Sequence, residues 1–209
     1  ECMERALVLR NHLFGPNSIE VKASRKSVGE LCNLLAMKNL EKNDFNSAIA
    51  LLRKATILTK QNPLNLAVTY NNLACYNRKQ GKLRTALQFL QKALKIEERC
   101  GSDVKYPADT YLNICAVLSQ LGRHQSALEN AQSALILLHE SAFKGNTDSL
   151  NIDKEKNVIR LDRIAVLAIA YYNIGVEQEF LKKDSCMRSY QKGYEVAQLY
   201  LGRDTLITI

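Results

Sequence analysis

Aliphatic, small and turn-forming residues recur along the chain at offsets that repeat from one segment to the next. Three aliphatic–small pairs occur, each with a turn residue eight positions after the aliphatic and an alanine thirteen after it. The pairs are Leu35-Ala36, Leu73-Ala74 and Ile114-Cys115, the turn residues are Asn43, Gly81 and Gly122, and the alanines are Ala48, Ala86 and Ala127. Small or apolar residues follow each alanine at helical spacing. The pattern predicts antiparallel helix pairs joined by tight turns.

A single helical hairpin cannot bury its own apolar face, but stacked copies can. We therefore predict an all-α solenoid held together by contacts between neighbouring hairpins. A fourth copy begins at Ile174-Gly175 and keeps the register only if one residue is deleted near 181–184. Residues 1–13 match the second half of a repeat, so we expect an orphan helix and further repeats in a larger chain.

The expected organisation is a single solenoid over residues 1–209. It comprises an orphan second helix at 1–15, repeats at 20–60, 63–101 and 107–143, an inserted loop at 144–157 and a divergent repeat at 158–202. The polar loop is followed in this scheme by a long helix from about Val158 to Leu181. Pro63 and Pro107 stand where first helices begin, a position where the missing N–H costs nothing.

The pattern resembles the tetratricopeptide repeat family. The motif is carried by Tyr70, Leu73-Ala74, Gly81, Ala86, Leu90 and Ala93, and again by Tyr111, Ile114-Cys115, Gly122, Ala127, Ala131 and Ala134. Equivalent positions lie 38 to 59 residues apart, which is more than the length of the minimal repeat of this family. This longer spacing is similar to that of the long repeats of kinesin light chain-like adaptors. The resemblance implies a right-handed α-solenoid and a non-catalytic module that binds a peptide or helix of a partner protein in a concave groove.

By the same resemblance, the first helices turn one face toward the groove. The expected inward residues are Glu30, Asn33, Met37 and Leu40; Val68, Asn71, Cys75, Arg78 and Lys79; Asp109, Leu112, Ala116, Ser119 and Gln120; and Ile169, Tyr172, Val176 and Glu179. The candidate peptide-binding residues are Asn33, Asn71, Asn72, Arg78, Lys79, Asn113, Tyr172 and Asn173.

The candidate residues differ in the chemistry they offer. Asn72, Asn113 and Asn173 each precede the motif aliphatic, and an amide can bond a peptide backbone or, alternatively, a neighbouring helix. Tyr172 offers a rigid amphipathic anchor. The segment 78–105 holds eight cations and three carboxylates, which suits an acidic peptide or the acidic tail of a cytoskeletal protein, or is simply a solvated face.

Composition and charge narrow the functional classes. The chain has 46% hydrophobic residues, enough for a real core, and a net charge of +8 that does not select a partner. Nucleic acid is disfavoured because basic residues are not interleaved with exposed aromatics. The longest apolar stretch, 164–176, is shorter than the roughly 20 residues that cross a bilayer, so no membrane role is expected. The scattered cysteines indicate an intracellular, cytoplasmic setting, in a cytoskeletal or ciliary context if the adaptor resemblance holds.

Catalysis finds little support in the sequence. His12, His124 and His139 have no partner at ligand spacing and are interpreted as surface residues. We expect no catalytic residues, no metal and no cofactor. The alternative to a peptide-binding adaptor is a permanent structural scaffold in a cytoskeletal or ciliary assembly, which would use the outer faces and the inserted loop.

Overall fold

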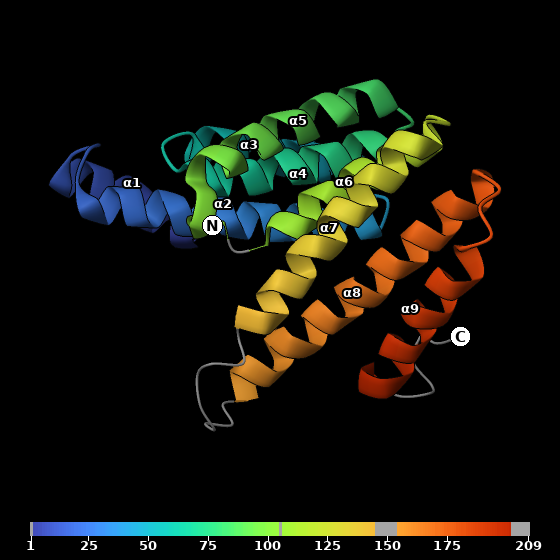
Figure 1. Ribbon diagram of the computed structural model, residues 1–209. Coiled ribbons are helices and arrows are strands. Elements are labelled where there is room, and N and C mark those ends of the chain that lie inside the picture. Colours follow the sequence, from blue (N-terminus) through green and yellow to red (C-terminus); the bar gives the residue numbers. More distant parts are fainter. Residues whose placement is uncertain (1, 105, 145–153, 202–209) are drawn as a thin grey trace. The chain divides into compact units, whose positions relative to one another are not determined.

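The computed structural model describes residues 2–104, 106–144 and 154–201, and of residues 102, 141–144, 154–162 and 199–201 it describes the backbone alone. Within these ranges the chain forms nine α-helices and one 3-10 turn, and no strand (Figure 1). Contacts divide it into two compact units, Glu1–Lys105 and Tyr106–Ile209. None of the described helices is long and apolar enough to span a membrane.

The first unit begins with a lone helix and continues with two hairpins. Its helices are α1 (Cys2–Phe14), α2 (Ile19–Glu41), α3 (Phe45–Thr59), α4 (Pro63–Lys79) and α5 (Leu83–Cys100), followed by the 3-10 turn η1 (Gly101–Asp103). Each helix packs against the next in the chain, and α2 also packs against α4. Contact between alternate helices is what stacks one hairpin on another, so this unit has the architecture of an α-solenoid.

The second unit repeats this arrangement with two hairpins. Its helices are α6 (Pro107–Gln120), α7 (His124–Lys144), α8 (Lys154–Phe180) and α9 (Cys186–Leu201), and α6 packs against α8 as well as α7. The expected inserted loop is shorter than 144–157, because Lys144 belongs to α7 and α8 already begins at Lys154. Lys154 to Lys156 are good helix formers with no glycine or proline to delay the start. Residues 145–153 of that expected loop lie outside the described residues.

All four hairpin turns end the first helix in the same way. The second residue after the helix, one past the C-cap, has a positive φ in each turn: Asn43 (61°), Gly81 (72°), Gly122 (70°) and Lys182 (54°). In each turn its N–H bonds the carbonyl three residues back, and the next N–H bonds the carbonyl five back, as in Asp44 to Asn39 and Lys183 to Gln178. These paired bonds form the Schellman motif, which satisfies carbonyls that the helix end leaves open. The fourth turn therefore lies at the same offset from the motif aliphatic as the other three turns. The one-residue deletion that the sequence requires falls after Lys182.

The small residue of each motif pair is buried where the first helix meets its neighbours. Ala36, Ala74 and Cys115 are almost fully buried, and Ala36 clusters with Leu52 and with Leu73 of the next hairpin. Leu35, the aliphatic of the first pair, is exposed, unlike its equivalents Leu73, Ile114 and Ile174. Leu73 packs on the preceding hairpin, whereas in the described chain only the single helix α1 precedes α2.

In the fourth hairpin a different pair of residues forms the close contact between the two helices. Gly175 occupies the small slot, and a Cβ there would lie 2.6 Å from Cδ1 of Tyr190. Tyr190 stands where the earlier hairpins carry Leu52, Leu90 and Ala131. A larger second-helix residue is thus matched by a smaller first-helix residue, which keeps the helix pair closely packed.

The first prediction concerns this pair. Gly175→Ala should lower the free energy of unfolding by about 1–3 kcal/mol, because the added methyl overlaps the Tyr190 ring. In a Tyr190→Leu background the same change should become neutral or stabilising by up to about 1 kcal/mol, since alanine is the better helix former. Urea unfolding followed by circular dichroism measures this double-mutant cycle. Strictly additive effects would show that the two residues do not pack together.

The second prediction concerns the left-handed lysine. Lys182→Gly should raise the free energy of unfolding by about 0.5–1 kcal/mol, because glycine removes the Cβ strain at positive φ while loosening the unfolded chain. Lys183→Gly, one residue on and without a positive φ, is the matched control and should give no gain. Equal effects at both positions would contradict the left-handed turn.

Candidate functional site

A hollow with a volume of about 390 Å³ opens between the first helices α2 and α4 of the first unit. We call it the α2–α4 hollow, and its lining residues are Glu30, Asn33, Leu34, Met37, Asn65, Val68 and Asn72. Both helices contribute residues at intervals of three or four, so the hollow follows one face of each. It lies between consecutive first helices, on the surface that the repeat pattern predicts to form the groove.

Hydrogen bonds between polar side chains hold the two walls of the hollow together. Asn33 donates through Nδ2 to Thr69 Oγ1 (2.9 Å), and its Oδ1 accepts from Asn72 Nδ2 (3.1 Å). Nearer the start of α4, Asn65 Nδ2 donates to Glu30 Oε1 (3.1 Å). Only 5% of Asn33 is exposed, so its amide works as a buried brace between α2 and α4.

Asn72 is placed differently from Asn33 although the two are bonded. Its side chain is half-buried and lines the hollow, and its Nδ2 is committed to Asn33. Its Oδ1 accepts no hydrogen bond from any residue that the structure describes. The amide is thereby oriented by the protein, with a carbonyl oxygen left for solvent or a ligand.

Apolar side chains flank these polar groups. Leu34 is 55% exposed and Val68 is 51% exposed, and Met37 beside them is half-buried. Contact between these aliphatic side chains and another apolar group is favourable by roughly 25 cal/mol for each Å² of apolar surface removed from water. The α2–α4 hollow therefore combines an apolar surface with a few fixed polar groups, the combination typical of ligand sites.

Three other candidates of the first unit do not line the hollow. Asn71 points toward α5, with Nδ2 3.5 Å from Glu97 Oε1 and 3.4 Å from the Ala67 carbonyl. Lys79 donates through Nζ to the Leu40 carbonyl (2.9 Å) and so holds the end of α2. Arg78 is half-buried near Cys75, whose thiol pKa is raised by burial and lowered in part by that guanidinium.

The remaining candidates belong to the second unit. Tyr172 is 59% exposed on α8, with its ring centroid 5.7 Å from that of Tyr190, while Asn113 and Asn173 are half-buried. Asp109 of α6 pairs with Arg163 of α8 (2.9 Å), and the guanidinium also lies 4.7 Å from the centroid of the Tyr106 ring. The first-helix surface of this unit thus carries a paired charge and an exposed tyrosine.

One interaction contradicts the expected surface position of His124. This residue is half-buried at the start of α7, and its Nδ1 lies 2.8 Å from Oε2 of Glu177, a residue only 2% exposed. Its ring stacks on Phe180 with centroids 4.2 Å apart. The partners lie 53 and 56 positions along the sequence, so helical spacing could not reveal them. Among the described residues no three His, Cys, Asp or Glu side chains gather as a metal site.

Residues 66–103, from the fourth residue of α4 to the end of η1, match the family model of the tetratricopeptide repeat. No curated protein matches the chain by sequence.

Several solved structures share the fold. BtubC (BKLC) from P. vanneervenii is 17% identical with a TM-score of 0.51, and the match covers 96% of this chain and 90% of that one. MamA is 18% identical with a TM-score of 0.54, over 93% and 86% of the two chains. The TPR-like repeats of a putative kinesin light chain from Podosopora anserina are 14% identical with a TM-score of 0.53, over 94% and 84%. Residues 66–103 therefore form a tetratricopeptide repeat, and the chain has the fold of tetratricopeptide-repeat solenoids, kinesin light chain-like repeats included.

Proposed function

We propose that the chain is a non-catalytic interaction module that binds a peptide segment of a partner protein in the α2–α4 hollow, as part of a larger adaptor. The observation that carries the proposal is the exposure of Leu34 and Val68 on either side of a hollow whose polar groups are held in place. An apolar side chain of the partner would cover both residues and gain the free energy of their burial.

Asn72 supplies the polar half of the proposed recognition. Its Oδ1 is oriented by the bond to Asn33 and can accept a hydrogen bond from a backbone N–H of the peptide. Such a bond does not depend on the side chain of the ligand, so it favours a range of sequences with one apolar anchor. Because Asn72 is already fixed, little conformational entropy is lost on binding.

The second unit contributes further candidate contacts to the proposal. Tyr172 is exposed on α8, and Asn113 on α6 and Asn173 on α8 are half-buried. In the first unit Lys79 is engaged with Leu40, which leaves Arg78 as the remaining cation of the expected basic pair. Six cysteines without disulfides suit a reducing compartment, and we propose a cytoplasmic adaptor in a cytoskeletal or ciliary setting.

A second candidate function is the permanent scaffold. The second helices carry single exposed apolar residues on their outer faces, among them Ile57 on α3, Ile136 on α7 and Tyr194 on α9. Isolated exposed residues of this kind are common on soluble proteins, so they favour an outer interface less than the α2–α4 hollow favours a peptide.

The third prediction separates these two functions. Val68→Glu should weaken binding of peptides selected on the chain by about tenfold or more. The substitution removes the free energy gained by burying one valine side chain and places a charge in the contact. Ile57→Glu is the matched control, another β-branched aliphatic on an exposed helix face, at 77% exposure. Peptides come from a random 12-residue display library, and fluorescence anisotropy gives the Kd.

Three results of this test are informative. Loss of binding with Val68→Glu but not with Ile57→Glu supports the hollow. The reverse pattern, in assembly with native partners, would move the interaction to the outer face. A library that yields no peptide above the background of an unrelated helical protein would contradict the proposed function.

The fourth prediction concerns Asn33, whose amide we expect to stabilise the fold, and Asn72, whose amide we expect to bind the peptide. Asn33→Ala should lower the free energy of unfolding by about 1–3 kcal/mol, because it removes a buried brace between α2 and α4. Asn72→Ala should lower peptide affinity by about threefold to tenfold, the loss of one hydrogen bond, with a smaller effect on unfolding. Urea unfolding and anisotropy measure the two quantities. An Asn72→Ala variant that binds normally would remove this residue from the site.

A further inference from the structure

A second hollow, with a volume of about 520 Å³, lies at the N-terminal half of α2. We call it the basic hollow, because Lys22, Arg25 and Lys26 of α2 line it, opposite Leu58 of α3 and the following residues Gln61 and Asn62. No carboxylate is among its lining residues. Its net charge is therefore positive, in contrast to the α2–α4 hollow, whose one charged residue is Glu30.

The three cations are not used by the fold. The side chains of Lys22, Arg25 and Lys26 form no ion pair and no hydrogen bond with any described residue. Elsewhere in the same unit Lys54 pairs with Glu4, and Lys79 bonds a helix carbonyl. Three like charges around one hollow repel one another. An acidic group placed among them would replace this electrostatic repulsion with attraction.

The two hollows open on the same face of α2. Lys22, Lys26, Asn33 and Met37 are spaced by 4, 7 and 4 residues, which places them along one line of the helix. The hollows also adjoin at the start of α4, since Asn62 lines the first and Asn65 the second. Their centres are about ten residues apart along α2, or roughly 15 Å. An extended chain covers that distance in about four or five residues.

We infer that the partner peptide carries acidic residues that bind in the basic hollow, about four or five positions from the apolar residue that enters the α2–α4 hollow. This inference rests on the proposed function and adds the charge and spacing of its ligand. A peptide is favoured over nucleic acid because no aromatic residue lines the basic hollow for base stacking, and Leu58 and Ala23 make part of its wall apolar.

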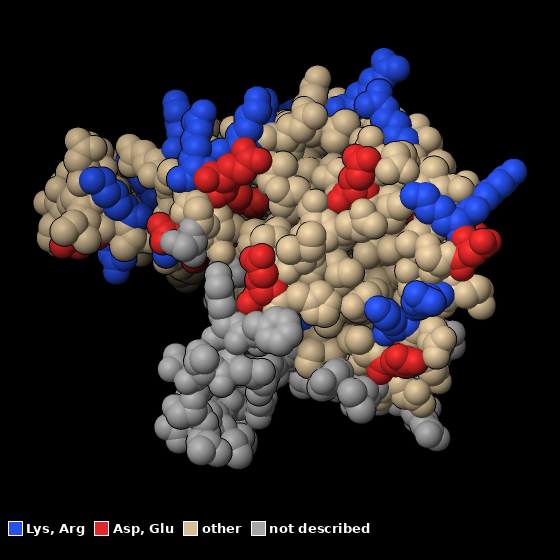
Figure 2. Space-filling model, in the orientation of Figure 1, with Lys and Arg blue, Asp and Glu red and all other residues tan. Residues whose placement is uncertain are grey.

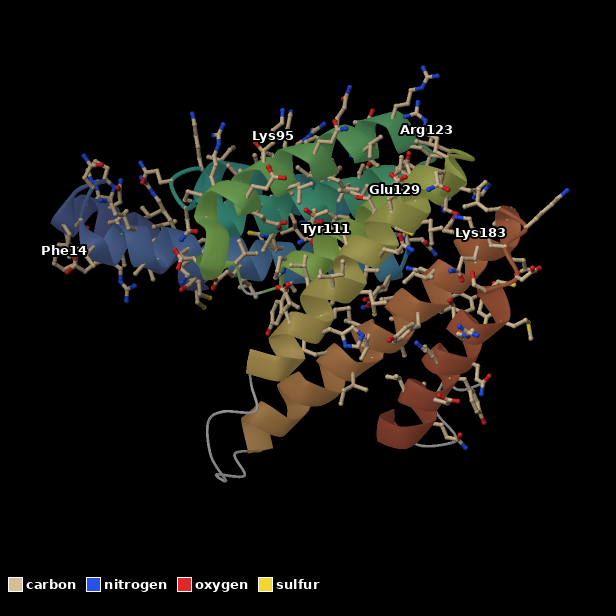
Figure 3. All side chains as sticks on the ribbon, in the orientation of Figure 1. Phe14, Lys95, Tyr111, Arg123, Glu129 and Lys183 are labelled. Carbon is tan, nitrogen blue, oxygen red and sulfur yellow. The ribbon has the colours of Figure 1, made fainter. Side chains whose placement is uncertain are left out.

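The fifth prediction is tested by peptide display on the 209-residue chain. Random 12-residue peptides are selected on the unmodified chain and on a variant with Lys22→Gln, Arg25→Gln and Lys26→Gln. The control variant carries Lys82→Gln, Arg84→Gln and Lys95→Gln, which removes the same charge from exposed positions at α5, within the segment 78–105 that is the competing basic surface for an acidic peptide. Figure 2 shows lysine and arginine side chains projecting over α5, and in Figure 3 Lys95 points outward from that helix.

The expected result is a pair of features in the selected peptides. Peptides enriched on the unmodified chain and on the control variant carry an apolar residue and, about four or five positions away, Asp or Glu. Selection on the Lys22/Arg25/Lys26 variant keeps the apolar residue and loses the acidic preference. For an acidic peptide, the Kd on this variant rises by about tenfold or more, and added salt reduces the difference.

The outcomes distinguish the inference from the function on which it rests. Apolar enrichment without acidic residues at the stated spacing, or an equal loss of affinity in both triple variants, would overturn the inference and leave the proposed function standing. Absence of an apolar anchor in every selection would overturn both. A single-stranded oligonucleotide that binds the chain, with loss only in the Lys22/Arg25/Lys26 variant and no acidic peptides selected, would replace the peptide with nucleic acid. Circular dichroism is used to check that each triple variant is folded.

Discussion

The close approach of the two helices in each hairpin is the constraint on which the remaining structure depends. A small residue on the first helix allows it: Ala36 and Ala74 are almost fully buried, and Gly175 makes room for the ring of Tyr190. Once this contact is fixed, the turn falls eight residues after the motif aliphatic, whether glycine, asparagine or lysine occupies it. The same contact fixes which face of the first helix is left for the groove.

The orientation of α2 shows how packing and binding share one helix. Ala36 turns toward Leu52, whereas Asn33 and Met37, three residues before it and one after it, line the α2–α4 hollow. A substitution that changes the hairpin packing would therefore rotate or shift the hollow as well. The buried bond from Asn33 to Thr69 adds a polar requirement to this arrangement, since a slipped register would leave the buried Nδ2 of Asn33 without its acceptor.

Local periodicity in the sequence predicts the helices, the first three turns and the all-α solenoid, because helical spacing and turn residues are local signals. The fourth turn is harder to find, since Lys182 adopts a conformation that lysine disfavours and only its offset from Ile174 marks it. His124 and Glu177 meet through tertiary packing that no local pattern encodes.

The candidate site was predictable to the level of the helix face but not of each residue. Asn71 and Asn72 are adjacent, and one position rotates a side chain by about 100° around a helix. That rotation sends Asn71 toward α5 and leaves Asn72 in the α2–α4 hollow. Hydrogen-bond partners on other helices decide between the two, and they are visible only once the hairpins are stacked.

Helix length explains why the two hollows differ in character. The helix α2 has 23 residues and α4 has 17, and the bond from Asn65 to Glu30 shows that α4 runs beside the C-terminal half of α2. The first two turns of α2 therefore extend past Pro63, where α4 begins, and their cations meet no residue of a neighbouring first helix. The repeat pattern produces the apolar hollow between the two helices, whereas the extra length of α2 produces the basic one. Selectivity for a ligand would then come from a departure of this chain from regular repetition, because regular repeats alone would offer the same surface at every step.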